Sequence, residues 1–422
     1  MYTQPVDPAW LEAYAKLALR VNRALSEAGH DAFLDYRGPD TWRTDVTEEE
    51  LPPPGRLIDD AEKLLADLPA DPQRATYLAG QIRALRAMAR RLDGQVLPLN
   101  EFVRECLDVS GEWLDEAVFE EAHATLDAAL PGPGSLAEKF HRWQDHHRLP
   151  TDAQSRIPDL IASAVAETRR RTNRIVSLPE DEEVGCTLID KAPYLAAGYH
   201  AGGSRSSIFI NTSLPFNLAD LLYVVAHEGH PGHIAEQVLK ERHLVQERGL
   251  AEQNVRFMIS PHFVLSEGLG LHGQDILFSG DEAQAWLRDT VLAEYDIPAD
   301  GSDFAAIHRA RNVLFGVWTN AALLLAQGRP EAEVASYLMR WALIRESEVD
   351  LVLPLLNAPV GAVYVFCYYQ GWELLRPWLD APDRDARVRR LLTEQLHPAT
   401  LNSATPASDS TEGPASAESA SS

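Results

Sequence analysis

The chain has 422 residues, and 63 acidic against 38 basic residues give it a formal net charge of −25. Hydrophobic residues make up 45% of the sequence, which is typical of a folded globular protein. The acidic excess argues against nucleic acid and against an anionic membrane as partners, because both are bound through clustered lysine and arginine.

The remaining composition favours a reduced compartment. The three cysteines lie far apart without metal-binding spacing, so we expect neither a disulfide framework nor a thiolate metal cage. The first residues lack the basic and apolar regions of a signal peptide, and no apolar run approaches the ~20 residues of a membrane span. We therefore expect a cytoplasmic protein.

The first part of the chain, residues 1–180, predicts a helical bundle that covers the rest. Apolar residues recur at helical spacing, and Pro- and Gly-rich clusters at 52–55 and 131–134 mark turns between the predicted helices. The clearest amphipathic runs cover residues 11–21, 57–68 and 78–92.

The pattern changes between residues 184 and 214. Cys186–Asp190 and Ser206–Asn211 predict short β-strands separated by glycines, and the second is a candidate edge strand. The helical pattern resumes from about 217 to 393 within the predicted metal-binding region, 181–397. Residues 398–422 are rich in Ser, Ala, Thr and Pro, which predicts a disordered tail.

A histidine cluster closes the apolar stretch that begins near Asp220. His227, Glu228, His230 and His233 fall within seven residues. Neutral histidine is the commonest metal ligand, and an adjacent carboxylate is typical of metal-assisted hydrolysis. The alternative is a solvated helix end with histidines by chance, but the number of histidines favours a metal site.

The cluster departs from the HExxH pattern, because the fourth residue after His227 is Pro231. On a straight helix His227 and His233 would point ~120° apart. Pro231 followed by Gly232 predicts a kink that could bring these two histidines together. His227 with His230 needs no kink, so helical periodicity leaves both pairs open.

Glu267 is the candidate third ligand. It follows His227 by 40 residues, a separation typical of zinc peptidases whose third ligand is glutamate, and small residues after it allow another helix to approach closely. A surface acid is the alternative interpretation. His272, five residues later, is a candidate for supporting the site or contacting the substrate.

These segments resemble the bacterial domain-of-unknown-function family 885, which is similar to Taq-type metallocarboxypeptidases and, more distantly, to angiotensin-converting enzyme. The resemblance covers roughly residues 190–378 and is carried by the His-Glu-x-x-Pro-Gly-His segment, by Glu267-Gly268, and by Pro359 through Gly371. Leu269 stands where the family has Trp, so the chain resembles a divergent member.

The resemblance implies a mainly α fold of the gluzincin type: a large helical bundle with a deep cleft and a small β-hairpin or short sheet near the active site. It also implies that His230 occupies a variable position. The ligand set of one zinc ion per chain would then be His227, His233 and Glu267, with the metal near the middle of the cleft.

The chemistry that follows is peptide hydrolysis by metal-activated water, as in a carboxypeptidase or an oligopeptidase. Glu228 is the candidate general base. Tyr368, which falls on the family's Tyr-x-x-Gly position, is the candidate donor to the oxyanion. Further candidates for contacting a peptide or small amide substrate are His200, Arg205, Ile208, Ile210, His230, His272, Arg311 and Tyr369.

Two other functions use the same residues. One is hydrolysis of a non-peptide amide or ester, and the other is a catalytically inactive binding protein with the shape of a zinc peptidase. Loss of activity in a Glu228→Gln variant that retains its metal would separate the enzymes from the binding protein.

Overall fold

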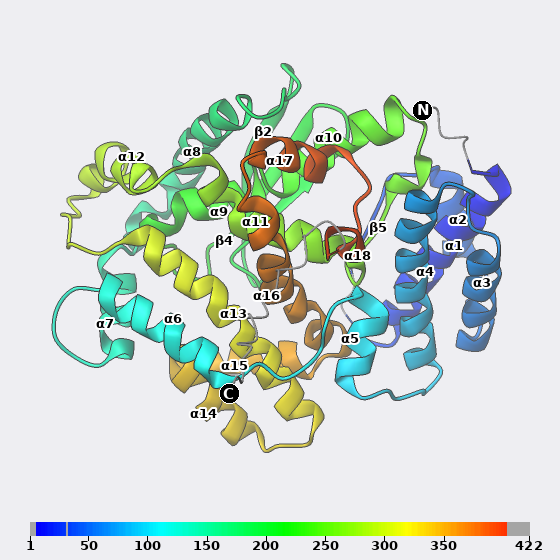
Figure 1. Ribbon diagram of the computed structural model, residues 1–422, viewed down its shortest axis with the longest axis horizontal. Coiled ribbons are helices and arrows are strands. Elements are labelled where there is room, and N and C mark those ends of the chain that lie inside the picture. The colour runs from blue at the N-terminus through cyan, green and yellow to red at the C-terminus, as the bar shows by residue number, and fades with distance from the viewer. Residues whose placement is uncertain (1–5, 31–32, 403–422) are drawn as a thin grey trace, which may run out of the picture.

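The computed structural model describes residues 6–30 and 33–402. It is mainly helical, as the sequence predicted, and the described residues also form two small sheets (Figure 1). The helices of the first part are α1 (Pro8–Glu27), α2 (Asp40–Glu48), α3 (Pro54–Ala66), α4 (Pro72–Leu92), α5 (Leu99–Leu107), α6 (Glu116–Ala129), α7 (Leu136–His146) and α8 (Ile157–Thr172). Those of the second part are α9 (Leu221–Glu228), α10 (His233–Lys240), α11 (Pro261–Leu277), α12 (Glu282–Thr290), α13 (Phe304–Ala326), α14 (Glu331–Trp341), α15 (Glu346–Asn357), α16 (Pro359–Leu379), α17 (Arg384–Thr393) and α18 (Pro398–Asn402).

Local sequence determines where the first helices begin. The three predicted amphipathic runs form α1, α3 and α4, each with its apolar face buried. Pro54 and Pro72 begin α3 and α4, where a missing N–H costs nothing. The carboxylates of Asp7 and Asp71 accept backbone N–H groups at the starts of α1 and α4.

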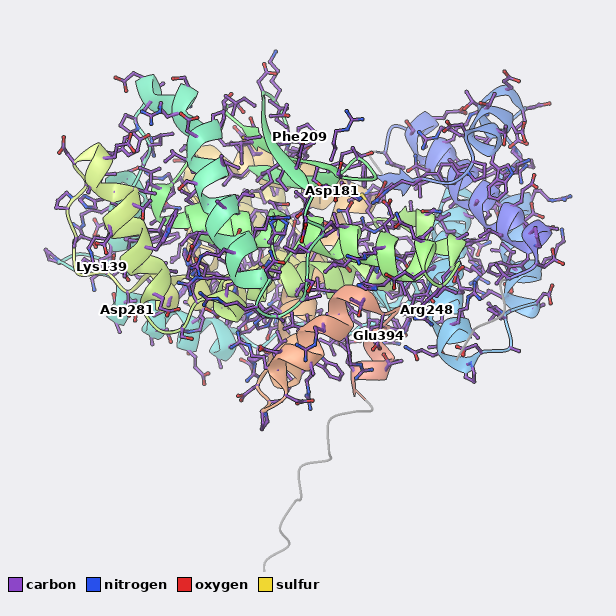
Figure 2. All side chains as sticks on the ribbon, turned by 90° about the horizontal axis from the view of Figure 1, so that it is seen from above. Lys139, Asp181, Phe209, Arg248, Asp281 and Glu394 are labelled. Atoms are coloured by element: carbon purple, nitrogen blue, oxygen red, sulfur yellow. The ribbon has the colours of Figure 1, made fainter. Side chains whose placement is uncertain are left out.

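Helices α11 and α16 pack on each other in the middle of the molecule (Figure 1). Helix α9 packs on α11, and α13 packs between α16 and α6. The helices α1 to α4 lie at one end, next to α5 (Figure 1). In the view from above, Phe209 and Glu394 lie on opposite sides of the central helices (Figure 2). Phe209 belongs to a sheet, and Glu394 directly follows α17.

The larger sheet has three strands, in the order β2 (Glu183–Ile189), β4 (Arg205–Asn211), β3 (Ala196–His200). Strand β4 pairs in parallel with β2 and antiparallel with β3. The prediction that Ser206–Asn211 is an edge strand is therefore wrong. The glycine-containing segment 196–200 forms a strand as well, and it covers the edge that β4 would otherwise expose.

A second, two-stranded sheet pairs β1 (Leu34–Tyr36) with β5 (Val255–Phe257). It joins the first helices to the segment that leads into α11. Buried apolar residues from 1–180 and from 181–397 belong to one continuous core. At the other end of the chain, residues 398–402 form α18 with Leu401 buried, so this part of the predicted tail is ordered. The rest of that tail, 403–422, lies outside the described residues.

Among residues 6–30 and 33–402, no single helix is long and apolar enough to cross a membrane. Helices α15 and α16 meet the length and hydropathy requirements only together, and they are bent by 105° relative to each other.

Candidate metal centre

The metal-binding segment is two helices rather than one. Helix α9 ends at Glu228 and α10 begins at His233. Between them the His230–Pro231 peptide is cis, and the N–H of Gly232 donates to the carbonyl of Ala226 over 3.0 Å. A Cβ on Gly232 would lie 1.8 Å from the carbonyl oxygen of His227, so only glycine fits there. The predicted break at Pro231-Gly232 is confirmed.

The break brings His227, His233 and Glu267 together. The Nε2 atom of His227 lies 3.2 Å from Oε2 of Glu267, and Nε2 of His233 lies 3.5 Å from Oε1. The two imidazole rings are 4.7 Å apart and nearly perpendicular. One ligand atom from each residue lies within 4.8 Å of the other two. These are the three residues predicted as ligands.

The donor set fits zinc. Two imidazoles and one carboxylate, leaving a fourth position open, form the usual set of a catalytic zinc site. Atom Oε2 of Glu267 is buried without a hydrogen-bond partner, although Nε2 of His227 lies close to it. A shared metal ion would satisfy both atoms.

A hydrogen-bond chain orients His233. The hydroxyl of Ser266 donates to the carboxylate of Glu236, so its oxygen accepts the Nδ1–H of His233 over 3.0 Å. This bond places the ring proton on Nδ1 and leaves Nε2 to bind metal. Glu236 is buried and also accepts from Lys240 over 2.7 Å.

Small residues on α11 allow the neighbouring helices to approach, as predicted. A Cβ on Gly270 would lie 2.6 Å from Nδ1 of His227, and a Cβ on Gly268 would lie 2.4 Å from the carbonyl oxygen of Gly371 in α16. A methyl group at either position would separate α11 from the metal site or from α16.

Electrostatic coupling is strong inside this buried site. Burial by itself would raise the pKa of Glu267, but His233 and His227 lower it well below its usual range. Burial opposes protonation of His233, yet Glu267 raises the pKa of that histidine to about 9, and Glu228 adds to the effect. Glu228 follows His227 directly in the chain, at the last position of α9, so the candidate base belongs to the same helix end as the first candidate ligand.

Strand β3 crosses directly over the end of α9. The N–H of Gly198 donates to Oε2 of Glu228 over 2.7 Å. A Cβ on Gly198 would lie 2.1 Å from the carbonyl oxygen of Glu228, so this contact requires glycine. The candidate general base is thus held between the metal site and the sheet.

Two tyrosines lie one turn apart on α16, and the first of them contacts the site. Tyr364 donates its hydroxyl to Oε1 of Glu267, and the ring of Tyr368 lies 5.6 Å from that of Tyr364. Burial raises the pKa of both phenols well above the usual value, and Glu267 adds to both shifts. Tyr364 was missed in the sequence, although its position four residues before Tyr368 places both on one helix face.

His230 points away from the three candidate ligands. It is fully buried, and its Nε2 donates to both carboxylate oxygens of Glu182, at 3.0 and 3.1 Å. Glu182 also accepts from Arg169 over 3.1 Å. His230, which was predicted to contact the substrate, thus belongs to a polar cluster with Glu182 and Arg169.

The other predicted substrate contacts are spread over the fold. His200 bonds to Ser206 and to Glu241, and Arg311 is paired with Asp220 at 2.6 Å. His272 bonds to the carbonyl of Trp372 over 2.9 Å. These three side chains already have partners that belong to the fold.

The remaining predicted contacts lie in the sheet and on α16. Ile208 and Ile210 are fully buried in the core, while Arg205 is exposed at the start of β4. Tyr369 is buried and lies next to Trp372 and Gly316. None of the four contacts the candidate ligands through a described hydrogen bond or ion pair.

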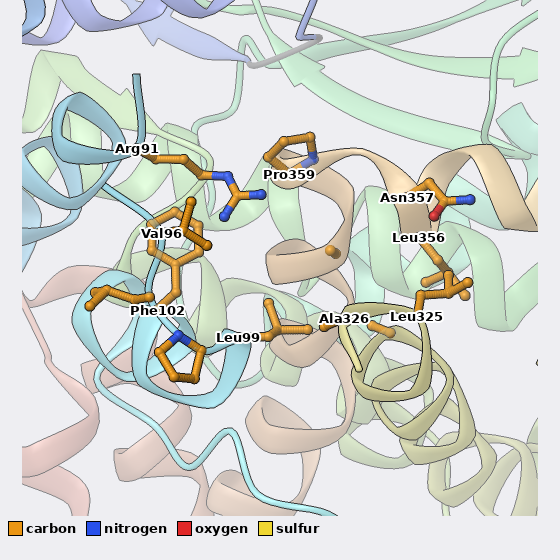
Figure 3. A pocket seen from close by; sticks show the side chains of 13 residues that line it. Arg91, Val96, Leu99, Phe102, Leu325, Ala326, Leu356, Asn357 and Pro359 are labelled. Atoms are coloured by element: carbon orange, nitrogen blue, oxygen red, sulfur yellow. The ribbon is translucent and has the colours of Figure 1, made fainter. Parts of the chain in front are cut away.

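A separate pocket of about 470 Å³ lies between the loop after α4 and the helices α13, α15 and α16 (Figure 3). Arg91, Phe102 and Pro359 line it, together with other mostly apolar side chains. None of the candidate metal ligands contributes to its wall. This pocket is therefore separate from the candidate metal centre.

No protein-family model and no curated protein matches the chain. Among solved structures it is similar to a "putative lipoprotein" from Colwellia psychrerythraea, with a TM-score of 0.51 and 12% identity over 82% of this chain. The chain spans 65% of the length of that protein. A "putative lipoprotein of unknown function" from Shewanella oneidensis matches 93% of this chain and 82% of its own, with a TM-score of 0.48 and 10% identity. At 12% identity, the similarity to the Colwellia protein shows a shared fold and nothing more.

Proposed function

We propose that the chain is a zinc-dependent peptide hydrolase of the carboxypeptidase or oligopeptidase kind. The observation that carries the proposal is the convergence of His227, His233 and Glu267 across a broken helix, with Glu228 beside them. We also propose that the chain is a divergent member of the domain-of-unknown-function family 885. One catalytic zinc ion per chain, a cytoplasmic location and the absence of nucleic-acid and membrane partners stay predictions.

In the proposed reaction the zinc ion, Glu228 and Tyr368 have different roles. A bound zinc ion would lower the pKa of a water toward ~7 and polarise the substrate carbonyl. Glu228 takes a proton from the attacking water and delivers it to the leaving amine. Tyr368 donates a hydrogen bond to the developing oxyanion, because its raised pKa keeps the phenol protonated.

The outer edge of β3, which pairs with no strand in the described part of the chain, favours a peptide as the substrate. The carbonyl of Leu195 accepts the N–H of Asn211, and the N–H of Ala201 donates to the carbonyl of Arg205, both in β4. In an antiparallel pair the alternate residues Gly198 and His200 therefore point their N–H groups away from β4. Among the described residues, these two N–H groups donate to the side chains of Glu228 and Gln237. An extended peptide could replace those side chains and add to the sheet.

A peptide-library digest of the zinc-loaded protein tests the proposal. We expect cleavage by the native chain and a loss of ~10²–10⁴-fold in the Glu228→Gln variant, which retains zinc but has no base. Glu183→Gln, an exposed change on β2, is the matched control. Equal activity in Glu228→Gln would contradict the mechanism. Cleavage of esters or simple amides alone would indicate a non-peptide hydrolase, and zinc binding without cleavage would indicate the binding protein.

A further inference from the structure

A second group of potential metal ligands lies outside the proposed active site. His146 is the last residue of α7, His147 caps that helix, and Asp300 lies in the loop that leads into α13. One ligand atom from each residue lies within 4.8 Å of the other two. The two imidazole rings are 4.7 Å apart and perpendicular.

Backbone carbonyls determine which nitrogen of each ring is free. Nδ1 of His147 bonds to the carbonyl of Trp143 over 3.0 Å, and Nε2 of His146 bonds to the carbonyl of Pro298 over 3.1 Å. Because a carbonyl oxygen only accepts, both of these nitrogens carry the proton. Nε2 of His147 and Nδ1 of His146 therefore keep lone pairs, which is how metal-binding histidines are usually prepared.

The carboxylate is also held in place. Oδ1 of Asp300 accepts the N–H of Ser302 over 3.0 Å and its hydroxyl over 2.6 Å. In the part of the chain that the structure describes, Asp300 forms no ion pair with a basic side chain. On the other side, His147 is only 1% exposed and packs edge-on against Phe304 at 5.0 Å. The ring and the carboxylate are thus both positioned before any ligand arrives.

We propose that His146, His147 and Asp300 form a second zinc site, distinct from the proposed catalytic one. Two imidazoles and one carboxylate suit Zn²⁺, with water completing its coordination. The site joins the end of α7 to the loop before α13. It also lies beside the strand-like contact in which the carbonyl of His147 accepts the N–H of Leu218, at the start of the segment that leads into α9. A bound ion there would stabilise the base of the helix that carries Glu228.

Zinc titration of purified protein tests this site independently of catalysis. In the His227→Ala/His233→Ala variant the proposed catalytic site is removed, and we expect one equivalent of Zn²⁺ to remain bound. Adding His146→Ala or Asp300→Asn to that background should weaken the remaining binding at least tenfold. Both of these side chains are partly exposed, so the fold should persist.

His141→Ala is the matched control, because His141 also bonds through Nε2 to a backbone carbonyl, that of Leu343, but belongs to no ligand group. It should leave zinc binding unchanged. Loss of all zinc in His227→Ala/His233→Ala would overturn the second site, as would binding that is unaffected by both His146→Ala and Asp300→Asn. In the otherwise native chain the same two changes should lower the stoichiometry from two zinc ions to one, and a stoichiometry unchanged by them would contradict the proposal even if the double variant did not fold.

Discussion

The carboxylate of Glu228 accepts the N–H of Gly198, so the candidate base is bonded to the strand that we expect to hold the substrate. A peptide that pairs with the outer edge of β3 must compete for this N–H. Substrate binding would then release the carboxylate at the moment when it is needed as a base. Peptide binding along β3 and release of the Glu228 carboxylate from its hydrogen bond to Gly198 would therefore occur together.

Substituting Gly198 tests this coupling. The added methyl group of Gly198→Ala would meet the carbonyl of Glu228 at 2.1 Å, so β3 must move away from α9. We expect kcat/KM for a peptide to fall at least tenfold while zinc stays bound. Gly185→Ala on β2, where the nearest atom is 3.9 Å away, should leave turnover intact. Unchanged kinetics in Gly198→Ala would argue against β3 as the substrate strand.

Replacing the candidate ligands one at a time should separate His233 from His230. Alanine at His227, His233 or Glu267 should strip the catalytic zinc, since each removes one of three ligands. Alanine at His230 should retain it but lower the free energy of unfolding by about 1–3 kcal/mol, because Glu182 loses a buried partner. Zinc analysis and urea unfolding of all four variants distinguish the roles. Zinc loss in His230→Ala with retention in His233→Ala would reverse the assignment.

The chain from His233 through Ser266 to Glu236 should control zinc affinity. Ser266→Ala leaves Nδ1 of His233 without its acceptor, and we expect the affinity to fall about 10–100-fold, as measured by competition with a chromogenic chelator. The control is Ser260→Ala, because the hydroxyl of Ser260 is also buried but has no hydrogen-bond partner in the described part of the chain. Equal affinities in the two variants would show that the chain does not orient the ligand.

Acid stability should depend on Glu241. The hydrogen bond from His200 lowers the pKa of this carboxyl to about 2, despite partial burial. In the unfolded chain the pKa of this carboxyl is near 4.5. Because its pKa is lower in the folded protein, the ionised carboxylate stabilises the fold above pH 4.5, and this contribution is lost as the pH falls toward 2. In urea unfolding, Glu241→Gln should therefore be less stable than the native chain at pH 6, with the difference shrinking by pH 3. A difference that does not change with pH would contradict this linkage.

Features that depend on neighbouring residues can be predicted from the local sequence. The break in the metal helix follows from Pro231 and Gly232, which cannot continue α9 whatever surrounds them. The close approach around Glu267 follows from the glycines that come after it on the same helix. The helical spacing of apolar residues and the identity of the residues were sufficient for these predictions, as they were for the mainly helical fold.

Features that depend on residues distant in the chain become visible in the folded structure and could not be predicted from local sequence. Glu182 pairs with His230 across 48 residues, and this buried contact, rather than helical periodicity, turns that histidine away from the metal site. The central position of β4 depends on β2 and β3 adding to both of its edges. Strand order and buried ion pairs are set by which distant segments pack together, and local sequence does not encode that choice.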